Sequence, residues 1–309
     1  MTSNHRFILV TKKTRLEMLI FKYNTIDQAR FYIRHMGMSF DDYEQEHENY
    51  QKALRQCIEI LNRIGKVLQL DRSFLPNYIF DSQDIVVVLG QDGLVANTLK
   101  YLNEQKVIAI NPDPNRYDGV LLPFKVTQLG TVIADVLAGK RMYKEISMAK
   151  AILNNGQSLY AVNDLFIGHK SHVSAKYQIS VHNRSEVQSS SGIIISTGLG
   201  STGWLKSILD GAKGIIESAT QTTVKMSSLE VPWDANKLYF SVREPFKSKG
   251  TDHTIVFGQI VEHEVLTIES RMAQDGRIFS DGIEDDYLEF NAGAIVSIVL
   301  CDHKGKLII

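Results

Sequence analysis

A glycine-flanked aspartate is the first pattern in the sequence that could do chemistry. Gly90-Gln91-Asp92-Gly93 follows Ile85 to Leu89, a continuous β-branched run that predicts a strand buried on both faces. Glycines let the backbone approach phosphate oxygens, and the amides at the start of a helix attract negative charge. Asp92 would then accept the proton of an attacking hydroxyl in a phosphoryl transfer. The tetrapeptide leaves one alternative open, in which Asp92 caps the helix and the glycines serve only the turn.

A second glycine-rich loop, Ser196 to Trp204, follows the apolar run Gly192 to Ile195. It holds four hydroxyl side chains and three glycines in nine residues, which supply many donors and close access to the backbone. A hydroxyl-rich turn without a ligand would have the same composition. Because the chain has two such loops, each between a predicted strand and a predicted helix, a nucleotide-type site is the favoured interpretation.

A polar pair, Asn163-Asp164, interrupts an apolar stretch that runs from Tyr160 to Gly168. Polar groups inside a strand are costly unless they are hydrogen-bonded. Either neighbouring protein groups satisfy this pair or a ligand does, and an amide beside a carboxylate suits a base edge and two ribose hydroxyls. His169 and His172 lack a third ligand at metal-binding spacing, so we expect no protein metal site.

Composition excludes several classes of protein. The 309 residues carry 34 Lys and Arg against 35 Asp and Glu, a formal net charge of −1, which argues against binding nucleic acid or an anionic membrane. The two cysteines, Cys57 and Cys301, exclude a disulfide framework and a cysteine zinc site. No apolar run reaches the ~20 residues that span a bilayer, and no targeting segment is recognisable. We therefore expect a cytoplasmic enzyme with small-molecule substrates, no nucleic-acid partner and no membrane partner.

The elements that must position these residues are of two kinds. Residues 85–110 read as strand, loop, helix and strand, the repeating unit of a parallel sheet, and an apolar stripe from Tyr50 to Ile64 predicts a preceding helix. After about Gly119 a helix, Leu129 to Ala138, precedes many predicted strands. These strands are Ala149–Leu153, Leu159–Val162, Tyr177–Val181, Leu238–Val242, Thr254–Phe257 and Val265–Ile268, with hairpin turns at Asn154-Asn155-Gly156 and Gln274-Asp275-Gly276 and a helix at Trp204–Leu209.

In their order along the chain, the motifs resemble the NAD kinases, most closely the branch that includes the mitochondrial type. The resemblance runs from about Asp84 to Leu300 and rests on the order and spacing of the motifs rather than on any one of them. The motifs are Gly90-Gln91-Asp92-Gly93, Asn111-Pro112-Asp113-Pro114, Asn163-Asp164, Ser190-Ser191-Gly192, the loop from Ser196 to Trp204, Phe240-Ser241-Val242-Arg243-Glu244-Pro245 and Leu288-Glu289-Phe290-Asn291-Ala292-Gly293-Ala294.

This resemblance implies a fold and a reaction. An α/β N-terminal domain with a Rossmann-like parallel sheet (residues 1–118 with 288–309) would handle the phosphate donor, and a β-rich, β-sandwich-like C-terminal domain (residues 119–287) would bind NAD. The active site would lie between them. The reaction implied is transfer of the γ-phosphoryl group of ATP, with Mg²⁺, to the 2′-hydroxyl of the adenosine ribose of NAD. Such enzymes are usually homodimers or homotetramers, so we expect a homo-oligomer.

The resemblance also implies roles for single residues. Asp92 corresponds to the family aspartate that helps to activate the hydroxyl, and the motif residues Gly90, Gln91 and Gly93 would lie beside the phosphates. The resemblance implies that Asn163 and Asp164 bind NAD, because they match the Asn-Glu/Asp pair that holds adenosine. Thr202, Gly203 and Trp204 match the Thr-Ala-Tyr stretch that lines the adenine pocket. Ser207 matches a serine one helical turn further on.

Two departures from the family pattern lie beside Asp92. Gln91 replaces the second glycine, and Leu94 replaces a threonine. The side chain of Gln91 would either narrow the approach of a phosphate or donate to a phosphate oxygen. Two other functions therefore stay open, a related kinase that acts on a lipid or sugar hydroxyl and a non-catalytic protein that binds NAD or another nucleotide.

Overall fold

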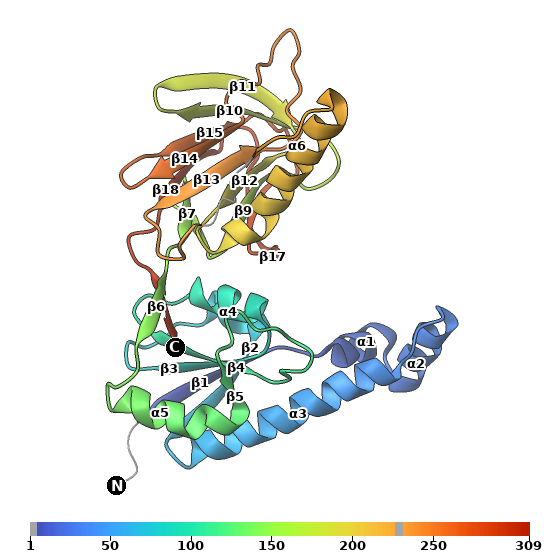
Figure 1. The fold of residues 1–309 in the computed structure, drawn as a ribbon, viewed down its shortest axis with the longest axis vertical. Helices are drawn as coiled ribbons and strands as arrows, with labels where there is room; N and C mark the ends of the chain where they lie inside the picture. Colours follow the sequence, from blue (N-terminus) through green and yellow to red (C-terminus); the bar gives the residue numbers. More distant parts are fainter. Residues whose placement is uncertain (1–4, 226–230) are drawn as a thin grey trace. The chain divides into compact units, whose positions relative to one another are not determined.

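The computed structural model describes residues 5–225 and 231–309, and the chain forms two compact units (Figure 1). Met1–Lys144 with Lys306–Ile309 form a unit of helices around a largely parallel sheet, which we call the α/β unit. Glu145–Gly305 form a unit of two antiparallel sheets, which we call the β-rich unit. The predicted fold class, α/β followed by β-rich, is confirmed.

The sheet of the α/β unit has the strand order β2-β1-β3-β4-β19-β6, with β5 beside β4. β1 pairs in parallel with β2 and β3, and β4 pairs in parallel with β3 and β19, so the carboxyl ends of these strands share one edge. The register sets Val10 opposite Val88 and Leu89 opposite Ile110. The strands are β1 (Arg6–Thr11), β2 (Lys66–Asp71), β3 (Ile85–Leu89), β4 (Lys106–Asn111), β5 (Phe124–Lys125), β6 (Tyr143–Ile146) and β19 (Gly305–Ile308).

Helices cover both faces of this sheet. α3 (Asp41–Asn62) and α5 (Leu129–Leu137) lie on one side and α4 (Asp92–Leu99) on the other (Figure 1). The apolar stripe of α3, which includes Cys57, packs on β1 and β3, as the sequence predicts. Toward the N-terminus, α1 (Arg15–Tyr23) and α2 (Ile26–His35) pack against each other around a small apolar cluster. Two short 3₁₀ turns are η1 (Arg72–Asn77) and η2 (Val126–Gln128).

The β-rich unit packs two six-stranded antiparallel sheets around a single core. Ile179 and Ile268 of the first sheet and Ile195 and Phe240 of the second belong to this core. The first sheet holds β7 (Ala149–Leu153), β8 (Ser158–Ala161), β10 (Ala175–Val181), β11 (Arg184–Ser190), β15 (Leu266–Ser270) and β18 (Ile295–Leu300). The second holds β9 (Asp164–His169), β12 (Ile193–Ser196), β13 (Lys237–Val242), β14 (Phe257–Val261), β16 (Gly276–Ser280) and β17 (Ile283–Glu289).

One helix, α6 (Trp204–Thr220), follows the 3₁₀ turn η3 (Gly200–Thr202) and packs on the second sheet of the β-rich unit. Its contact with the sheet runs through Leu205, which clusters with Tyr239 of β13. The sequence predicts this helix only to Leu209, whereas it continues to Thr220.

Two predictions of local structure are wrong. The predicted hairpin at Gln274-Asp275-Gly276 instead links β15 of the first sheet to β16 of the second. Gly276 is required there by close packing, because a Cβ would lie 2.0 Å from the Phe290 carbonyl oxygen. The strand predicted at Thr254–Phe257 begins only at Phe257, because the amides of Thr254 and Ile255 donate to the carboxylate of Glu186 instead of to a strand.

Tyr50 connects α3 to the carboxyl edge of the sheet. Its hydroxyl donates to the Leu89 carbonyl (3.1 Å) and accepts from the Lys12 amide (3.2 Å). We expect Tyr50→Phe to lower the free energy of unfolding by about 1–2 kcal/mol, because a buried carbonyl and an amide lose their partner. Urea unfolding of the two proteins measures the difference. Tyr43→Phe on the same helix is the control and should leave stability unchanged; an equal loss in both variants would contradict the prediction.

Candidate functional site

The loop Gly90–Gly93 leaves β3 at the carboxyl edge of the sheet and begins α4. Gln91 occupies the N-cap position in an extended conformation, and its carbonyl accepts from the amides of Leu94 (2.8 Å) and Val95 (3.3 Å). Asp92 is the first helical residue, so capping does not account for it. Its Oδ1 accepts from the Leu121 amide at 2.7 Å, which anchors the carboxylate through one oxygen.

The two glycines of this loop have different structural reasons. A Cβ at Gly90 would lie 2.6 Å from the side chain of Leu94, so this glycine allows the first turn of α4 to pack against the strand end. A Cβ at Gly93 would meet nothing within 4 Å, and the residue is exposed. The open space at Gly93 beside the first amides of α4 is what the approach of a phosphate group needs.

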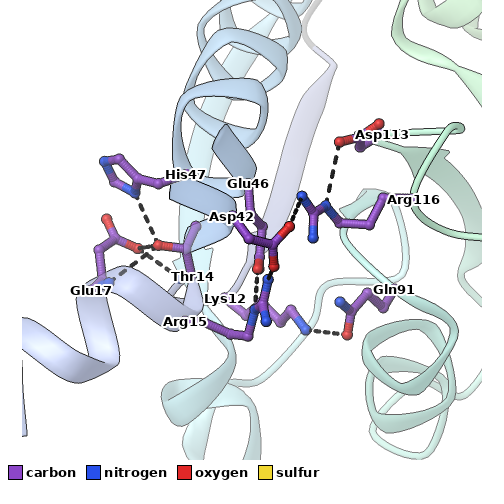
Figure 2. A network of polar contacts seen from close by, with 10 residues as sticks. All are labelled: Lys12, Thr14, Arg15, Glu17, Asp42, Glu46, His47, Gln91, Asp113 and Arg116. Atoms are coloured by element: carbon purple, nitrogen blue, oxygen red, sulfur yellow. Dashed lines mark hydrogen bonds and ion pairs between the residues drawn. The ribbon is translucent and has the colours of Figure 1, made fainter. Parts of the chain in front are cut away.

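Charged side chains gather at the same edge, on the segments that follow β1 and β4 and at the start of α3 (Figure 2). Arg15 donates to Glu46 and to Asp42 (2.6 Å), and Arg116 donates to the other oxygen of Asp42 (2.7 Å). Hydrogen bonds from Arg116 and Arg15 lower the pKa of Asp42 to about 2. Lys12 donates from Nζ to Oε1 of Gln91 at 2.6 Å.

Sequence reasoning missed these charged residues, and the available signal was weak. Lys12 directly follows β1 at Thr11, and Arg116 lies five residues beyond the end of β4 at Asn111. A charged residue just after a buried parallel strand is a candidate for the ligand edge of the sheet. The signal becomes specific only when the partner strand and its register are known.

In the β-rich unit, Asn163 lies between β8 and β9, and Asp164 begins β9. The carboxylate of Asp281 accepts from the backbone amides of Val162 (3.1 Å), Asn163 (2.6 Å) and Asp164 (3.3 Å). Protein groups therefore satisfy the backbone of the polar pair, and Asp281 is a residue that sequence reasoning missed.

The side chain of Asp164 is not satisfied in the same way. Its Oδ1 is buried and has no hydrogen-bond partner among the described residues. Burial raises the pKa of Asp164 to about 7, the charge of Asp281 adds to this, and a hydrogen bond with Ser196 opposes it. A buried carboxyl oxygen without a partner is the position where a ligand donor would be favourable.

The loop Ser196–Trp204 packs directly against this pair. The amide of Thr197 donates to the Asn163 carbonyl (3.0 Å), and the hydroxyl of Thr197 donates to the Val162 carbonyl (2.6 Å). A Cβ on Gly200 would lie 2.2 Å from the Asn163 carbonyl oxygen, so only glycine allows this approach. The loop has the Gly-x-Gly-x-x-Gly spacing, but β12 is antiparallel to β9 and β13, unlike the parallel unit of a dinucleotide fingerprint.

A cavity of about 560 Å³ adjoins the end of this loop. The ring of Trp204 stacks on that of Phe166 with centroids 6.1 Å apart and planes 5° from parallel. The Arg243 guanidinium lies 5.5 Å from the Trp204 ring. The lining combines aromatic rings with positive side chains, which suits a flat ligand that carries negative charge. The residues that give this character are Phe166, Trp204, Phe279, Lys170, Arg243 and Arg277.

The predicted site residues thus lie in two groups. Gly90, Gln91, Asp92 and Gly93 come together at the carboxyl edge of the α/β unit. The remaining residues lie in the β-rich unit. Asn163 and Asp164 pack beside the loop Ser196–Trp204, and the others lie at the end of this loop and on the first turn of α6. In that turn the Ser207 amide donates to the Gly203 carbonyl (3.1 Å). This second group is Asn163, Asp164, Thr202, Gly203, Trp204 and Ser207.

Within residues 5–225 and 231–309, no group of three or more His, Cys, Asp or Glu side chains lies close enough together to hold a metal ion. Mg²⁺ is commonly held by one or two carboxylates together with substrate phosphates rather than by a cage of protein ligands. A donor that carries its own Mg²⁺ is therefore compatible with a single nearby carboxylate such as Asp92.

The raised pKa of Asp164 predicts how stability depends on pH. Because the folded protein holds this proton up to about pH 7, stability falls as pH rises from about 4 through 7. Asp164→Asn removes this loss, so the stability of the variant relative to the wild type should increase over that range, by at most about 4 kcal/mol. Urea unfolding at pH 5 and pH 8 measures it. Asp285→Asn, at an exposed position on β17, is the control, and a pH-independent difference for Asp164→Asn would contradict the prediction.

Comparisons with known proteins find relatives that are named NAD kinases. No protein-family model matches the chain. A curated relative named NAD kinase 2, mitochondrial, from Xenopus tropicalis is 23% identical over 96% of this chain and 88% of its own length. The Homo sapiens protein of the same name is 23% identical over 96% of this chain and 81% of its own length.

The fold has a solved counterpart. The crystal structure of yeast NADH kinase complexed with NADH superposes with a TM-score of 0.60 at 14% sequence identity, covering 99% of this chain and 84% of that chain. The names of these relatives indicate a kinase phosphotransferase, and the solved neighbour shows the same fold.

Proposed function

We propose that this chain is an NAD kinase, which transfers the γ-phosphoryl group of ATP to the 2′-hydroxyl of the adenosine ribose of NAD and gives NADP and ADP. The observation that carries the proposal is the position of Asp92. Gln91 takes the capping position, and Asp92 is anchored by the Leu121 amide through one oxygen. A carboxylate that is positioned but not used for the helix cap is suited to receive a hydroxyl proton.

On the donor side, the first amides of α4 and the open space at Gly93 would receive the phosphates of ATP. Mg²⁺ bound with ATP would supply charge neutralisation at these phosphates. Asp92 orients the attacking hydroxyl and takes its proton. We assign this work to the α/β unit, Met1–Lys144 with Lys306–Ile309.

On the acceptor side, we assign the adenosine of NAD to Asn163 and Asp164, with the unpartnered oxygen of Asp164 accepting from ribose hydroxyls. Thr202, Gly203 and Ser207 would line the same pocket, with Trp204 as its aromatic wall. The positive side chains around the cavity at Trp204 suit the pyrophosphate of the dinucleotide. This part of the proposal belongs to the β-rich unit, Glu145–Gly305.

Location and assembly belong to the proposal as well. Within the described residues, no helix combines the length and the apolar character that a membrane crossing requires. We propose a cytoplasmic enzyme, although the two curated relatives carry the word mitochondrial in their names. We also propose a homodimer or homotetramer, which light scattering of the purified chain measures directly.

The first test is the formation of NADP from NAD, ATP and Mg²⁺, read with an NADP-specific dehydrogenase. Asp92→Asn should lower kcat by ~10²–10⁴-fold, because a general base is lost, and should leave the Kd for NAD almost unchanged. Asp41→Asn, an exposed acid at the start of α3, is the matched control. A wild-type protein that is folded and binds NAD but forms no NADP would overturn the proposed function. Poor NAD binding by Asp92→Asn would make Asp92 a positioning residue.

Trp204 tests the acceptor side independently. Trp204→Leu should raise the KM for NAD about 2- to 10-fold with little change in kcat, because the aromatic stack is lost while Asp92 is untouched. Trp204→Tyr keeps an aromatic wall and should retain most of the affinity. If the leucine and tyrosine variants lose affinity equally, the aromatic ring does not contact the dinucleotide. Steady-state kinetics with NAD and, separately, NADH as acceptor measure both variants.

A further inference from the structure

Lys12 is a half-buried cation without a carboxylate partner. Its Nζ donates to the neutral amide oxygen of Gln91 at 2.6 Å, and among the described residues no Asp or Glu oxygen lies within ion-pair distance of it (Figure 2). Burial lowers the pKa of Lys12 and is the largest influence on it. A partly desolvated ammonium is stabilised most by an anion, so an anion bound at Lys12 would be favourable.

The charges around Lys12 also favour the binding of an anion. Glu46 is the acid that favours its charged form, but Glu46 is already bonded to Arg15. Arg15 and Arg72 both disfavour its charged form, so Lys12 stands among other cations. The neighbouring arginines Arg15 and Arg116 are committed to carboxylates, whereas Lys12 is not. Lys12 is thus a half-buried cation of this edge whose ammonium donates to a neutral amide.

Gln91 determines where this ammonium lies. Its amide oxygen accepts from Lys12, and a second side-chain hydrogen bond, to Tyr117, lowers the pKa of that tyrosine against the effect of burial. The side chain of Gln91 is thus turned to protein partners just after β1 and in the loop after β4. The sequence leaves two roles open for Gln91: its side chain would donate to a phosphate oxygen or narrow the approach of a phosphate. The geometry supports neither as its main role.

The backbone positions make the contact possible. Val10 and Val88 are register partners, and Lys12 and Gly90 each come two residues later. The ammonium is thereby held against Gln91, directly before Asp92 and the first amides of α4. A glycine at position 91, as in the family pattern, has no side chain that could make this contact.

We propose that Lys12 binds the polyphosphate of the donor at the Gly90–Gly93 loop, and that Gln91 is the positioning residue that holds its ammonium there. The identity of the donor as ATP rests on the proposed function, whereas the binding of a polyphosphate anion does not. Lysine is suited to this work because its compact charge meets phosphate oxygens without a fixed bidentate geometry.

The test measures binding of inorganic tripolyphosphate and of ATP to the full chain by calorimetry. Lys12→Met should weaken both about 10- to 100-fold, because a charge-assisted hydrogen bond is lost, and should leave NAD binding unchanged. Lys12→Arg keeps the charge and should restore part of the affinity. Lys13→Met is the matched control, because Lys13 is the exposed neighbour whose ammonium lies over the Phe21 ring. Equal tripolyphosphate affinity in Lys12→Met and Lys13→Met would overturn the proposal.

A double-mutant cycle tests the role of Gln91. Gln91→Gly should weaken tripolyphosphate binding about 3- to 10-fold in the wild type and should have no further effect in Lys12→Met, because it acts only through the lysine. If Gln91→Gly costs the same factor in both backgrounds, Gln91 contacts the phosphate by itself and its positioning role is wrong.

The two proposals fail separately. A wild-type chain that binds tripolyphosphate in a Lys12-dependent way but forms no NADP leaves this inference standing and overturns the proposed function. A chain that forms NADP and binds tripolyphosphate equally well without Lys12 does the reverse. Urea unfolding and circular dichroism of each variant establish that a loss of binding is not a loss of fold.

Discussion

The hydrogen-bonded register of β1, β3 and β4 is the constraint on which the candidate donor site depends. The central residues of these strands are apolar and buried, so polar side chains are confined to the strand ends and to the loops that follow them. Because the strands are parallel, all three stop at one edge. A shift by one residue would reverse the faces of every side chain, so the packing of the core also fixes the position of the loop that carries Asp92.

Charged side chains lie together at the carboxyl edge of this sheet. Asp42 receives two arginines from different loops, and the low pKa that results keeps it ionised over the whole physiological range. Glu46 and Asp113 take part in the same network, so the arginines are balanced locally. The network thereby fixes the loops after β1 and β4 to α3, and a rigid frame of this kind is what a loop that must receive a phosphate requires.

Local patterns predicted the elements that depend on local chemistry, such as β3, α4 and the apolar stripe of α3. The errors came where a distant residue decides the outcome. Glu186 draws the amides of Thr254 and Ile255 away from a strand, and the close approach of the Phe290 carbonyl, not a hairpin, requires Gly276. The site behaves in the same way. The contact of Lys12 with Gln91 joins residues 79 positions apart, so no spacing rule applied to the sequence could find it.

Asp281 shows how such a distant residue shapes the acceptor side. Its backbone adopts a left-handed conformation (φ 53°) after β16, which places its carboxylate under three consecutive amides at the start of β9. Because the Asp281 carboxylate accepts from those amides, they do not need the side chain of Asp164 as a partner. Burial raises the pKa of Asp164 to about 7, and the charge of Asp281 adds to this effect. Asp281 therefore satisfies the backbone of the polar pair, whereas burial of the Asp164 carboxyl lowers stability as pH rises from about 4 through 7, a loss that a hydrogen-bond donor on a ligand would offset.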